Sequence, residues 1–384
     1  MFEYTLPCGG FKTHTIMTEN NIKFDPPVFE QRYCTVVQIL EDQKWLNEIK
    51  KVTEFGCAEM RLFQLIRRIG SIEHIVQVDI DEALLTTHLS RTDPLVSDYM
   101  RQRESPLHVD VFHGSVADSS AELLNTDVVI ALELIEHVYD DVLSKIPHNI
   151  FGYMHPKIVI ISTPNADFNV IFTRFSPLLP NGFRHHDHKF EWTRAEFKAW
   201  CLDITEKYPN YMCSIFGVGE APAGDESVGN VSQIALFVRK DLLDMPLVEP
   251  FNAQPEANCE TPYRNLHSVD FPFFKDTRTT EEKIWTQVQY ELHRATYRED
   301  YYDADRYVYK IAIAEILRCV EYLGATAEIL QQLLLENKKQ MENGYVIIEE
   351  DNYSSDHDSH DYSQDAQEQV EDANCTNEVE NWDA

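Results

Sequence analysis

The sequence lacks several features that would each have indicated a class of protein. No apolar run approaches the ~18–20 residues that a membrane-spanning helix needs, so we expect no integral membrane protein. The first residues also lack the basic and then apolar pattern of a signal peptide. The eight cysteines occur singly, without a CxxC pair, which argues against a disulfide framework and a zinc ribbon. These absences together favour a reducing, cytoplasmic compartment.

Basic residues are scarce as well. The 384 residues include 33 Lys and Arg against 65 Asp and Glu, which gives a formal net charge of −32. Because phosphate contacts need cations, this balance taken alone speaks against nucleic-acid binding. The excess is uneven, however, since residues 349–384 hold 13 acids and no Lys or Arg. The net charge therefore does not exclude a nucleic-acid partner, because a local basic patch could still bind phosphates.

Short β-rich runs alternate with helical stretches between residues 30 and 240. The runs are KVTEF, HIVQVDI, DVFHGSV, DVVIALEL, KIVIIST, MCSIFGV and QIALFVRK. This alternation predicts an α/β fold in which helices cover both faces of a mostly parallel sheet. An acidic loop with a glycine joins the last two runs, which predicts a final antiparallel hairpin. Seven strands that end in this way are typical of the Rossmann-like class I S-adenosylmethionine-dependent methyltransferases.

Composition divides the chain into five parts. We expect an N-terminal segment over residues 1–23, a methyltransferase domain over 24–242, a linker over 243–279, a helical extension over 280–343 and a disordered acidic tail over 344–384. Apolar residues at spacings of three and four in IAIAEILRCVEYL and AEILQQLLLENKK predict the helices of the extension. The tail has too few large apolar residues to offset the entropy cost of ordering it.

Candidate cofactor contacts follow the first strands, at the sheet edge where open α/β folds bind ligands. The run from Glu54 to Gly56 keeps one glycine of a cofactor loop, although a plain strand-to-helix turn explains it about as well. Asp79 could accept both ribose hydroxyls of a nucleoside, or could cap the next helix together with Asp81. The order and spacing favour S-adenosylmethionine over a nicotinamide cofactor. The predicted cofactor-binding residues are Glu54, Gly56, Asp79, Ser115 and Ala131.

Two clusters of carboxylates and imidazoles indicate a metal site. The fourth strand leads into Glu133-Leu134-Ile135-Glu136-His137, and Arg184-His185-His186-Asp187-His188-Lys189 follows the fifth. A mixed N/O ligand set with open positions suits Mg²⁺, Mn²⁺ or Co²⁺ better than a closed structural zinc. The alternative for the first cluster is a charged helix start. The alternative for the second is one histidine paired with Asp187 beside solvated ones.

The motifs ELIEH, STPN and HDHKFEWTR, with FDPPVFEQR at residues 24–32, together resemble the small-RNA 3′-terminal 2′-O-methyltransferases of the HUA-enhancer type. The resemblance spans residues 24–240 and is greatest to the animal and insect forms. It implies single-stranded piRNA and siRNA substrates, an Argonaute or PIWI partner, a monomeric state, and the cytoplasm or its RNA granules as the location. It also places Asp79 and Ser115 at the methyl donor. The metal ligands that it implies are Glu133, Glu136, His137 and His188.

The chemistry of a terminal ribose agrees with this resemblance. A divalent ion that binds both hydroxyls would select an RNA 3′ end and lower the pKa of the 2′-oxygen. His137, His185 or His186 could then take the proton. Two alternatives remain, namely a metal-dependent O-methyltransferase of a small vicinal diol and a catalytically inactive methyltransferase fold that acts as an interaction module. The cations that could meet terminal phosphates are Arg174, Arg184, Lys189 and Arg194.

Overall fold

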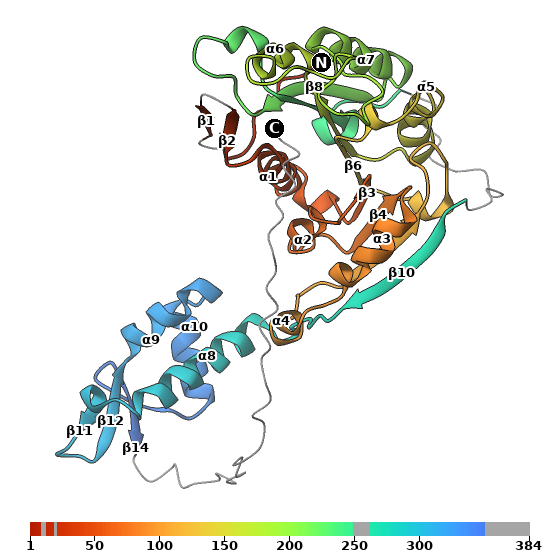
Figure 1. Ribbon diagram of the computed structural model, residues 1–384. Coiled ribbons are helices and arrows are strands. Elements are labelled where there is room, and N and C mark those ends of the chain that lie inside the picture. The colour runs from red at the N-terminus through yellow and green to blue at the C-terminus, as the bar shows by residue number, and fades with distance from the viewer. Residues whose placement is uncertain (9–12, 19–20, 249–261, 350–384) are drawn as a thin grey trace, which may run out of the picture. The chain divides into compact units, whose positions relative to one another are not determined.

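The structure, a computed structural model, describes residues 1–8, 13–18, 21–248 and 262–349. The described residues form two compact units, Met1–Lys275 and the residues from Asp276 onward (Figure 1). No helix in these ranges is long and apolar enough to cross a membrane. The six cysteines within them are all free, as the scattered spacing predicted. The predicted acidic tail lies outside the described residues from residue 350 on.

An eight-stranded sheet forms the centre of the first unit, in the order β10-β5-β4-β3-β6-β7-β9-β8. The strands are β3 (Lys51–Phe55), β4 (His74–Asp79), β5 (Leu107–His113), β6 (Val128–Leu132), β7 (Ile158–Pro164), β8 (Tyr211–Val218), β9 (Ser232–Arg239) and β10 (Arg264–Phe271). The five strands from β3 to β7 pair in parallel, and β8 and β9 form an antiparallel hairpin beside β7. The predicted class I methyltransferase fold is therefore confirmed, with all seven expected strands present.

Helices pack on both faces of this sheet (Figure 1). The helices are α1 (Val28–Leu40), α2 (Phe63–Ile66), α3 (Glu82–His88), α4 (Val96–Met100), α5 (Asp140–Leu143), α6 (Asn169–Phe172) and α7 (Arg194–Lys207), and a β1 (His14–Met17)–β2 (Ile22–Asp25) ladder precedes them. Successive strand residues point to opposite faces, so β7 supplies Ile158 and Ile160 to one apolar core and Val159 and Ile161 to another. Burial on both faces explains why the central strands β6 and β7 read as near-continuous apolar runs.

The eighth strand, β10, lies inside the stretch that the sequence predicted as a linker over residues 243–279. It pairs antiparallel with β5 at the edge of the sheet. That prediction fails here because the side chains of β10 are exposed or half-exposed except for the last residue, Phe271, which is buried. An edge strand of this kind carries little of the apolar pattern that reveals central strands.

The second unit combines helices with a sheet of its own. Its elements are α8 (Thr280–Ala295), β11 (Tyr302–Asp303), β12 (Val308–Ala312), α9 (Ile313–Val320), α10 (Ala327–Glu336), β13 (Gln340–Glu342) and β14 (Tyr345–Glu349). The four strands pair antiparallel in the order β11-β12-β14-β13. The helical extension predicted over 280–343 is thus incomplete. The predicted tail also begins too early, because β14 buries Val346 and Ile347 in the core of this unit.

Candidate active site

The loops after β3, β4, β5 and β6 meet at one edge of the sheet, because parallel strands end there together. Gly56 follows β3 with a φ of +69°, a conformation that glycine adopts without steric cost. Its N–H donates to the carbonyl of Val78 at 2.9 Å, which ties the first loop to β4. A Cβ at this position would lie 2.9 Å from Cδ1 of Leu134. The close approach explains why the one glycine kept in this loop is Gly56.

Asp79 joins two of these loops through its carboxylate. Its Oδ2 accepts a hydrogen bond from the Ala58 N–H and its Oδ1 one from the Asp81 N–H, both at 2.9 Å. The helix cap is Asp81, whose Oδ1 accepts from the Leu84 N–H at 2.9 Å. The two aspartates therefore divide the roles that the sequence left open. Asp81 caps α3, while Asp79 faces the loop after β3.

Glu54 and Ala131 lie deeper in the same region. The Glu54 side chain is buried, and its Oε2 has no hydrogen-bond partner among the described residues. Burial, with the nearby charge of Asp79, raises the pKa of this carboxyl to about 8. Ala131 is buried in β6 and packs into a core, so only its backbone offers a polar group. Glu54 could therefore offer a cofactor a carboxyl oxygen, whereas Ala131 could offer only its backbone N–H or carbonyl.

Ser115 lies just after β5 and is held by a residue that the sequence analysis missed. The Tyr263 hydroxyl donates to the Ser115 backbone carbonyl at 2.7 Å, and the Ser115 hydroxyl accepts from the Ala117 N–H at 3.2 Å. The Tyr263 ring covers Gly114, where an added Cβ would lie only 2.5 Å from it. Tyr263 directly precedes β10, so the missed strand explains the missed residue.

The turn Glu133–His137 begins where β6 ends. Glu133 has a left-handed φ of +46°. Its Oε1 accepts from the hydroxyls of Ser162 at 2.7 Å and Ser232 at 2.9 Å, and its Oε2 lies 3.5 Å from Nη1 of Arg32. Partners from three other elements therefore hold the Glu133 carboxylate in place.

Glu136 is completely buried. Its Oε2 accepts from the Thr163 hydroxyl at 3.0 Å, but its Oε1 has no hydrogen-bond partner among the described residues. Burial and then the charge of Glu133 raise the pKa of Glu136 well above its usual value. Burying a carboxylate with an unpaired oxygen costs free energy unless a cation or a hydrogen-bond donor contacts that oxygen. This turn therefore has the electrostatic character of a cation site.

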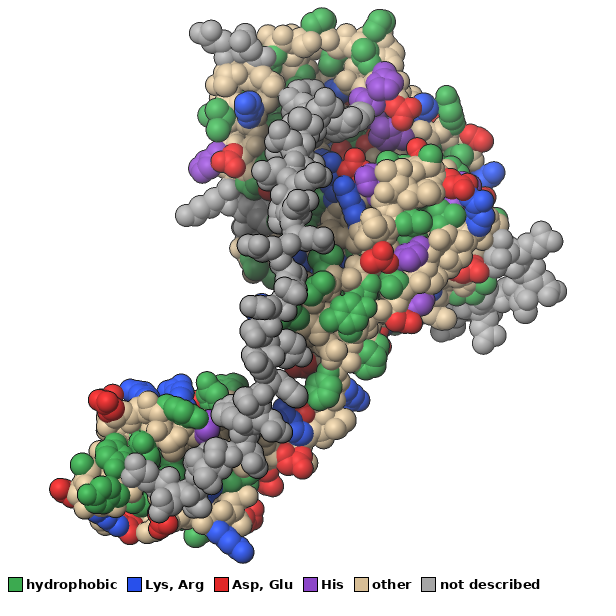
Figure 2. All heavy atoms as spheres, turned by 60° about the horizontal axis from the view of Figure 1, so that its bottom comes forward, with side chains coloured by type: hydrophobic (Ala, Val, Ile, Leu, Met, Phe, Trp, Pro, Cys, Tyr) green, Lys and Arg blue, Asp and Glu red, His purple; other side chains and the backbone are tan. Residues whose placement is uncertain are grey.

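Three histidines converge beside this turn. Ring nitrogens of His137, His185 and His188 lie within 4.8 Å of one another. The Lys189 N–H donates to the Glu136 carbonyl at 2.7 Å, so the second cluster is joined to the first. His186 is exposed and does not belong to this group, although its ring lies 4.1 Å from that of His185. Histidine and acidic side chains also lie together on the face of the first unit that Figure 2 shows.

Carboxylates orient two of the histidines. His137 Nδ1 lies 3.0 Å from Oδ2 of Asp187, and His188 Nδ1 lies 2.6 Å from Oε1 of the buried Glu191. A carboxylate on one ring nitrogen commonly orients the other toward a metal. Burial lowers the pKa of His137, with a further contribution from His188. Of the four metal ligands predicted from the sequence, this cluster contains His137 and His188, whereas Glu133 and Glu136 are not part of it. Imidazoles beside a turn that carries two carboxylates fit a divalent cation.

The cations around this loop already have carboxylate partners. Arg174 makes two hydrogen bonds of 2.7 Å to Asp225, and Lys189 lies 3.0 Å from Asp187. Arg184 lies 3.8 Å from Glu191 and stacks over the ring of Phe172. Arg194 lies 3.0 Å from Asp167. A phosphate at this loop would therefore share these cations with the protein's own acids.

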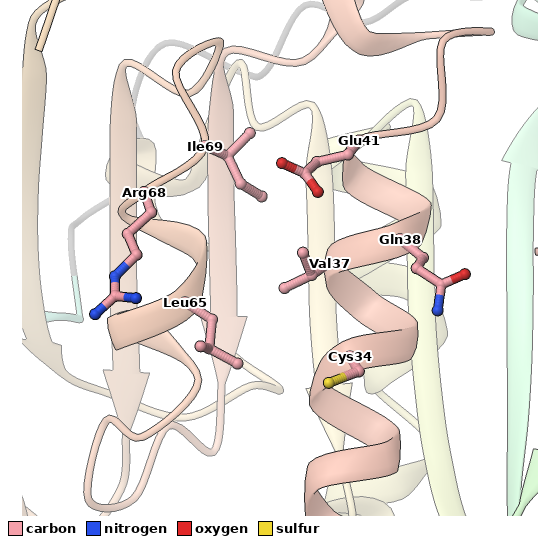
Figure 3. Close-up of a pocket in the computed structure, with 7 residues that line it drawn as sticks. All are labelled: Cys34, Val37, Gln38, Glu41, Leu65, Arg68 and Ile69. Carbon is pink, nitrogen blue, oxygen red and sulfur yellow. The ribbon is translucent and has the colours of Figure 1, made fainter. Parts of the chain in front are cut away.

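A separate cavity of 370 Å³ opens between α1 and α2. Its lining combines apolar side chains with a few polar ones, as Figure 3 shows. The lining residues are Cys34, Val37, Gln38, Glu41, Leu65, Arg68 and Ile69. None of them is a predicted site residue, so this cavity is distinct from the histidine cluster.

Comparison with known proteins agrees with this architecture. Residues 281–350, which cover most of the second unit, match the family model of the HEN1 methyltransferase C-terminal domain. A small RNA 2′-O-methyltransferase of Drosophila melanogaster is 59% identical over 91% of this chain and 90% of its own length. The Gallus gallus protein of the same name is 36% identical over 70% of this chain and 68% of its own length. The crystal structure of the small RNA methyltransferase HEN1 superposes with a TM-score of 0.50 at 24% identity, over 67% of this chain and 28% of that one, and supports the fold. With the sheet, the loops and the relatives in agreement, the chain belongs to the small RNA 2′-O-methyltransferase family of enzymes.

Proposed function

We propose that the protein transfers the methyl group of S-adenosylmethionine to the 2′-hydroxyl of the 3′-terminal nucleotide of single-stranded small RNAs, and so protects their 3′ ends. The observation that carries this proposal is the buried Glu136 Oε1, which has no hydrogen-bond partner in the part of the chain that the structure describes and lies on a turn joined to a three-histidine cluster. A site of this kind suits recognition of a diol, which among RNA positions occurs only at a 3′ terminus.

Glu133, Glu136, His137 and His188 would hold a divalent ion, which we take to be Mg²⁺ with Mn²⁺ or Co²⁺ as substitutes. When bound, the ion supplies a Lewis acid for the terminal diol and lowers the pKa of the 2′-hydroxyl. Asp187 and Glu191 hold the Nδ1 atoms of His137 and His188, which leaves each Nε2 as the ligand atom. This preorganised carboxylate–imidazole pairing is the strongest support for a resident metal.

The chain's own residues would supply the remaining chemistry. Asp79 has lone pairs beyond its two backbone bonds and would accept the ribose hydroxyls of the methyl donor. The 2′-oxygen attacks the sulfonium methyl carbon, so that a C–O bond forms as the C–S bond breaks and its electron pair stays on sulfur. His185, a histidine of the cluster outside the four ligands, would take the hydroxyl proton, because His137 has its Nδ1 beside Asp187 and its Nε2 assigned to the ion. His186 is less suited, because it lies outside the cluster.

The substrate class follows from the relatives together with the site. Proteins named small RNA 2′-O-methyltransferase match this chain at up to 59% identity. We infer piRNA and siRNA substrates, presented by an Argonaute or PIWI protein that leaves the 3′ end accessible. We further infer that the protein acts as a monomer in the cytoplasm or in its RNA granules. A delivering protein would also compensate for the scarcity of unpaired cations around the site.

The test is methyl transfer from labelled S-adenosylmethionine in the presence of Mn²⁺. A short single-stranded RNA with a 2′,3′-diol is compared with the same RNA carrying a 2′-deoxy terminus. We expect label on the diol RNA alone, loss of label with EDTA, and loss with His188→Ala. His186→Ala is the matched control and should keep more than half of the activity, because His186 lies outside the cluster.

Other outcomes of this assay would overturn the proposal. Equal label on the 2′-deoxy RNA would exclude the terminal 2′-hydroxyl as acceptor. Label only on a small vicinal diol such as a catechol would favour that alternative substrate class. Cofactor binding without transfer to any diol would indicate an interaction module.

A further inference from the structure

A second histidine–carboxylate cluster lies near the N-terminal ends of β4 and β5, whereas the active site lies at the carboxyl ends of the strands. His74 is the first residue of β4, whereas Asp79 at its other end belongs to the active site. His108 on β5 lies directly across from His74 on one side and from Asp270 of β10 on the other. Asp110, two residues after His108, points to the same face of β5. Three neighbouring strands therefore bring these side chains into one row.

The ligand atoms of this cluster already converge. His74 Nε2 lies 2.8 Å from Oδ2 of Asp110, and His108 Nε2 lies 3.2 Å from Oδ1 of the same carboxylate. One ligand atom from each of the three residues lies within 4.8 Å of the others. Ligand atoms at about 2.0–2.2 Å from a tetrahedral Zn²⁺ are about 3.3 Å apart. The two His–Asp110 distances are thus shorter than this spacing by about 0.1–0.5 Å, so these pairs would need to open only slightly to admit an ion.

Residues of β10 orient the same groups. His108 Nδ1 lies 2.8 Å from Oδ1 of Asp270, which leaves its Nε2 directed at Asp110. The amide of Asn265 donates to Asp110 Oδ1 at 3.3 Å, and the Ser268 hydroxyl donates to it as well. A carboxylate behind a ligating imidazole is the usual support of a protein metal site. The cluster therefore has both candidate ligands and a supporting layer.

We propose that His74, His108 and Asp110 form a second divalent-metal site, separate from the active site, for a transition metal of the zinc class. Two imidazoles and one carboxylate favour Zn²⁺, Co²⁺ or Ni²⁺ over Mg²⁺. The His74 and His108 side chains are 30% and 40% exposed, so water can reach a fourth position. The bound ion links β4 to β5, because its ligands lie on these two strands, while the partners that orient the ligands lie on β10.

The first test counts zinc ions bound by the metal-stripped full-length protein, using isothermal titration calorimetry. His74→Asn/Asp110→Asn should bind one Zn²⁺ fewer per chain than the wild type. His88→Asn, a histidine change on α3 outside both clusters, should keep the wild-type number. The proposal is overturned if the double variant binds as many ions, with the same affinities, as the wild type. Methyl transfer measured in parallel with Mn²⁺ reports separately on the active site.

A second measurement needs no variant and so does not depend on its folding. Amide hydrogen exchange of wild-type β4 and β5, His74–Asp79 and Leu107–His113, is compared with and without saturating Zn²⁺. We expect exchange in these strands to slow by about tenfold or more, because separation of β4 from β5 must then break the metal bonds. Unchanged exchange in both strands at saturating Zn²⁺ would show that the cluster is an ion-free hydrogen-bonded network, and would overturn the proposal.

Discussion

The Tyr263 hydroxyl donates a 2.7 Å hydrogen bond to the backbone carbonyl of Ser115, a residue 148 positions earlier in the chain. The bond links the residue before β10 to the loop after β5, where the cofactor is expected. The same ring packs over Gly114 and lies 6.2 Å from the ring of Phe112. Tyr263 therefore positions the third cofactor loop from outside the seven-stranded core of the fold.

Tyr263→Phe removes this hydrogen bond and keeps the ring. A net hydrogen bond of about 1 kcal/mol corresponds to about a fivefold change in an equilibrium constant. We expect the KM for S-adenosylmethionine to rise by about fivefold while kcat changes less than twofold. Steady-state kinetics at saturating RNA would measure both. The exposed Tyr290 provides a control, since Tyr290→Phe should leave KM unchanged. An unchanged KM in Tyr263→Phe would remove the positioning role.

Glu54 should make stability depend on pH. Its folded-state pKa is about 8, against an ordinary value of 4.5, because it is buried. An acid whose folded-state pKa is raised stabilises the fold most below its unfolded pKa, and this stability is lost as pH rises through the folded pKa. We expect the free energy of unfolding to fall between about pH 5 and pH 8 by roughly 2 kcal/mol more in the wild type than in Glu54→Gln. Urea unfolding at several pH values would check this.

A steeper decline in Glu54→Gln than in the wild type would contradict the assignment. Glu59→Gln is a suitable control, because Glu59 is a half-exposed acid of the same loop. Its unfolding profile should follow that of the wild type.

Glu136 should oppose folding when no metal is bound. Its buried Oε1 has no partner within the described ranges and its pKa is raised, so ionising this carboxyl costs free energy in the metal-free protein. In EDTA at pH 8 we expect the free energy of unfolding of Glu136→Gln, measured by urea unfolding, to exceed that of the wild type by about 1 kcal/mol or more. Its methyl-transfer activity should nevertheless fall by at least about a hundredfold.

The two effects of Glu136→Gln separate a ligand from a structural carboxylate. A merely structural role would lower both stability and activity. If Mn²⁺ raises the midpoint of thermal unfolding equally in the variant and the wild type, Glu136 does not bind the ion.

The sequence specified most of the fold through features that are local. Strands buried on both faces are near-continuous apolar runs, and such runs marked β6, β7 and β9. It missed β10 and β14 for opposite reasons. β10 is a half-exposed edge strand with little apolar signal, while β14 is a short apolar strand directly before an acidic stretch that dominates local composition.

The candidate site likewise combines residues that local sequence reveals with residues that only the fold brings together. The clusters around Glu136 and His188 were recognisable because each is compact in sequence. The assignment of Tyr263 was not possible, since its partner Ser115 is 148 residues away and only strand pairing brings them together. The choice among His185, His186 and His188 also needed the fold, because adjacent residues on a loop can face in different directions.

The carboxylates behind the histidines should set metal affinity unequally. Glu191 is buried and its Oε1 lies 2.6 Å from His188, whereas the Asp187 side chain is 54% exposed and lies 3.0 Å from His137. Glu191 is also fixed by Asn169 and by the Arg184 N–H, so its substitution disturbs His188 without a ready substitute. We expect Glu191→Gln to raise the Mn²⁺ concentration for half-maximal activity by about 10–100-fold.

Asp187→Asn should raise that concentration by only a few-fold, because water can replace an exposed partner. Calorimetric titration of Mn²⁺ in the absence of RNA would measure affinity apart from catalysis. Equal effects of the two substitutions would mean that burial of the supporting carboxylate does not matter. No effect of either would mean that His137 and His188 are oriented by the backbone alone, and the metal assignment would then rest on Glu133 and Glu136.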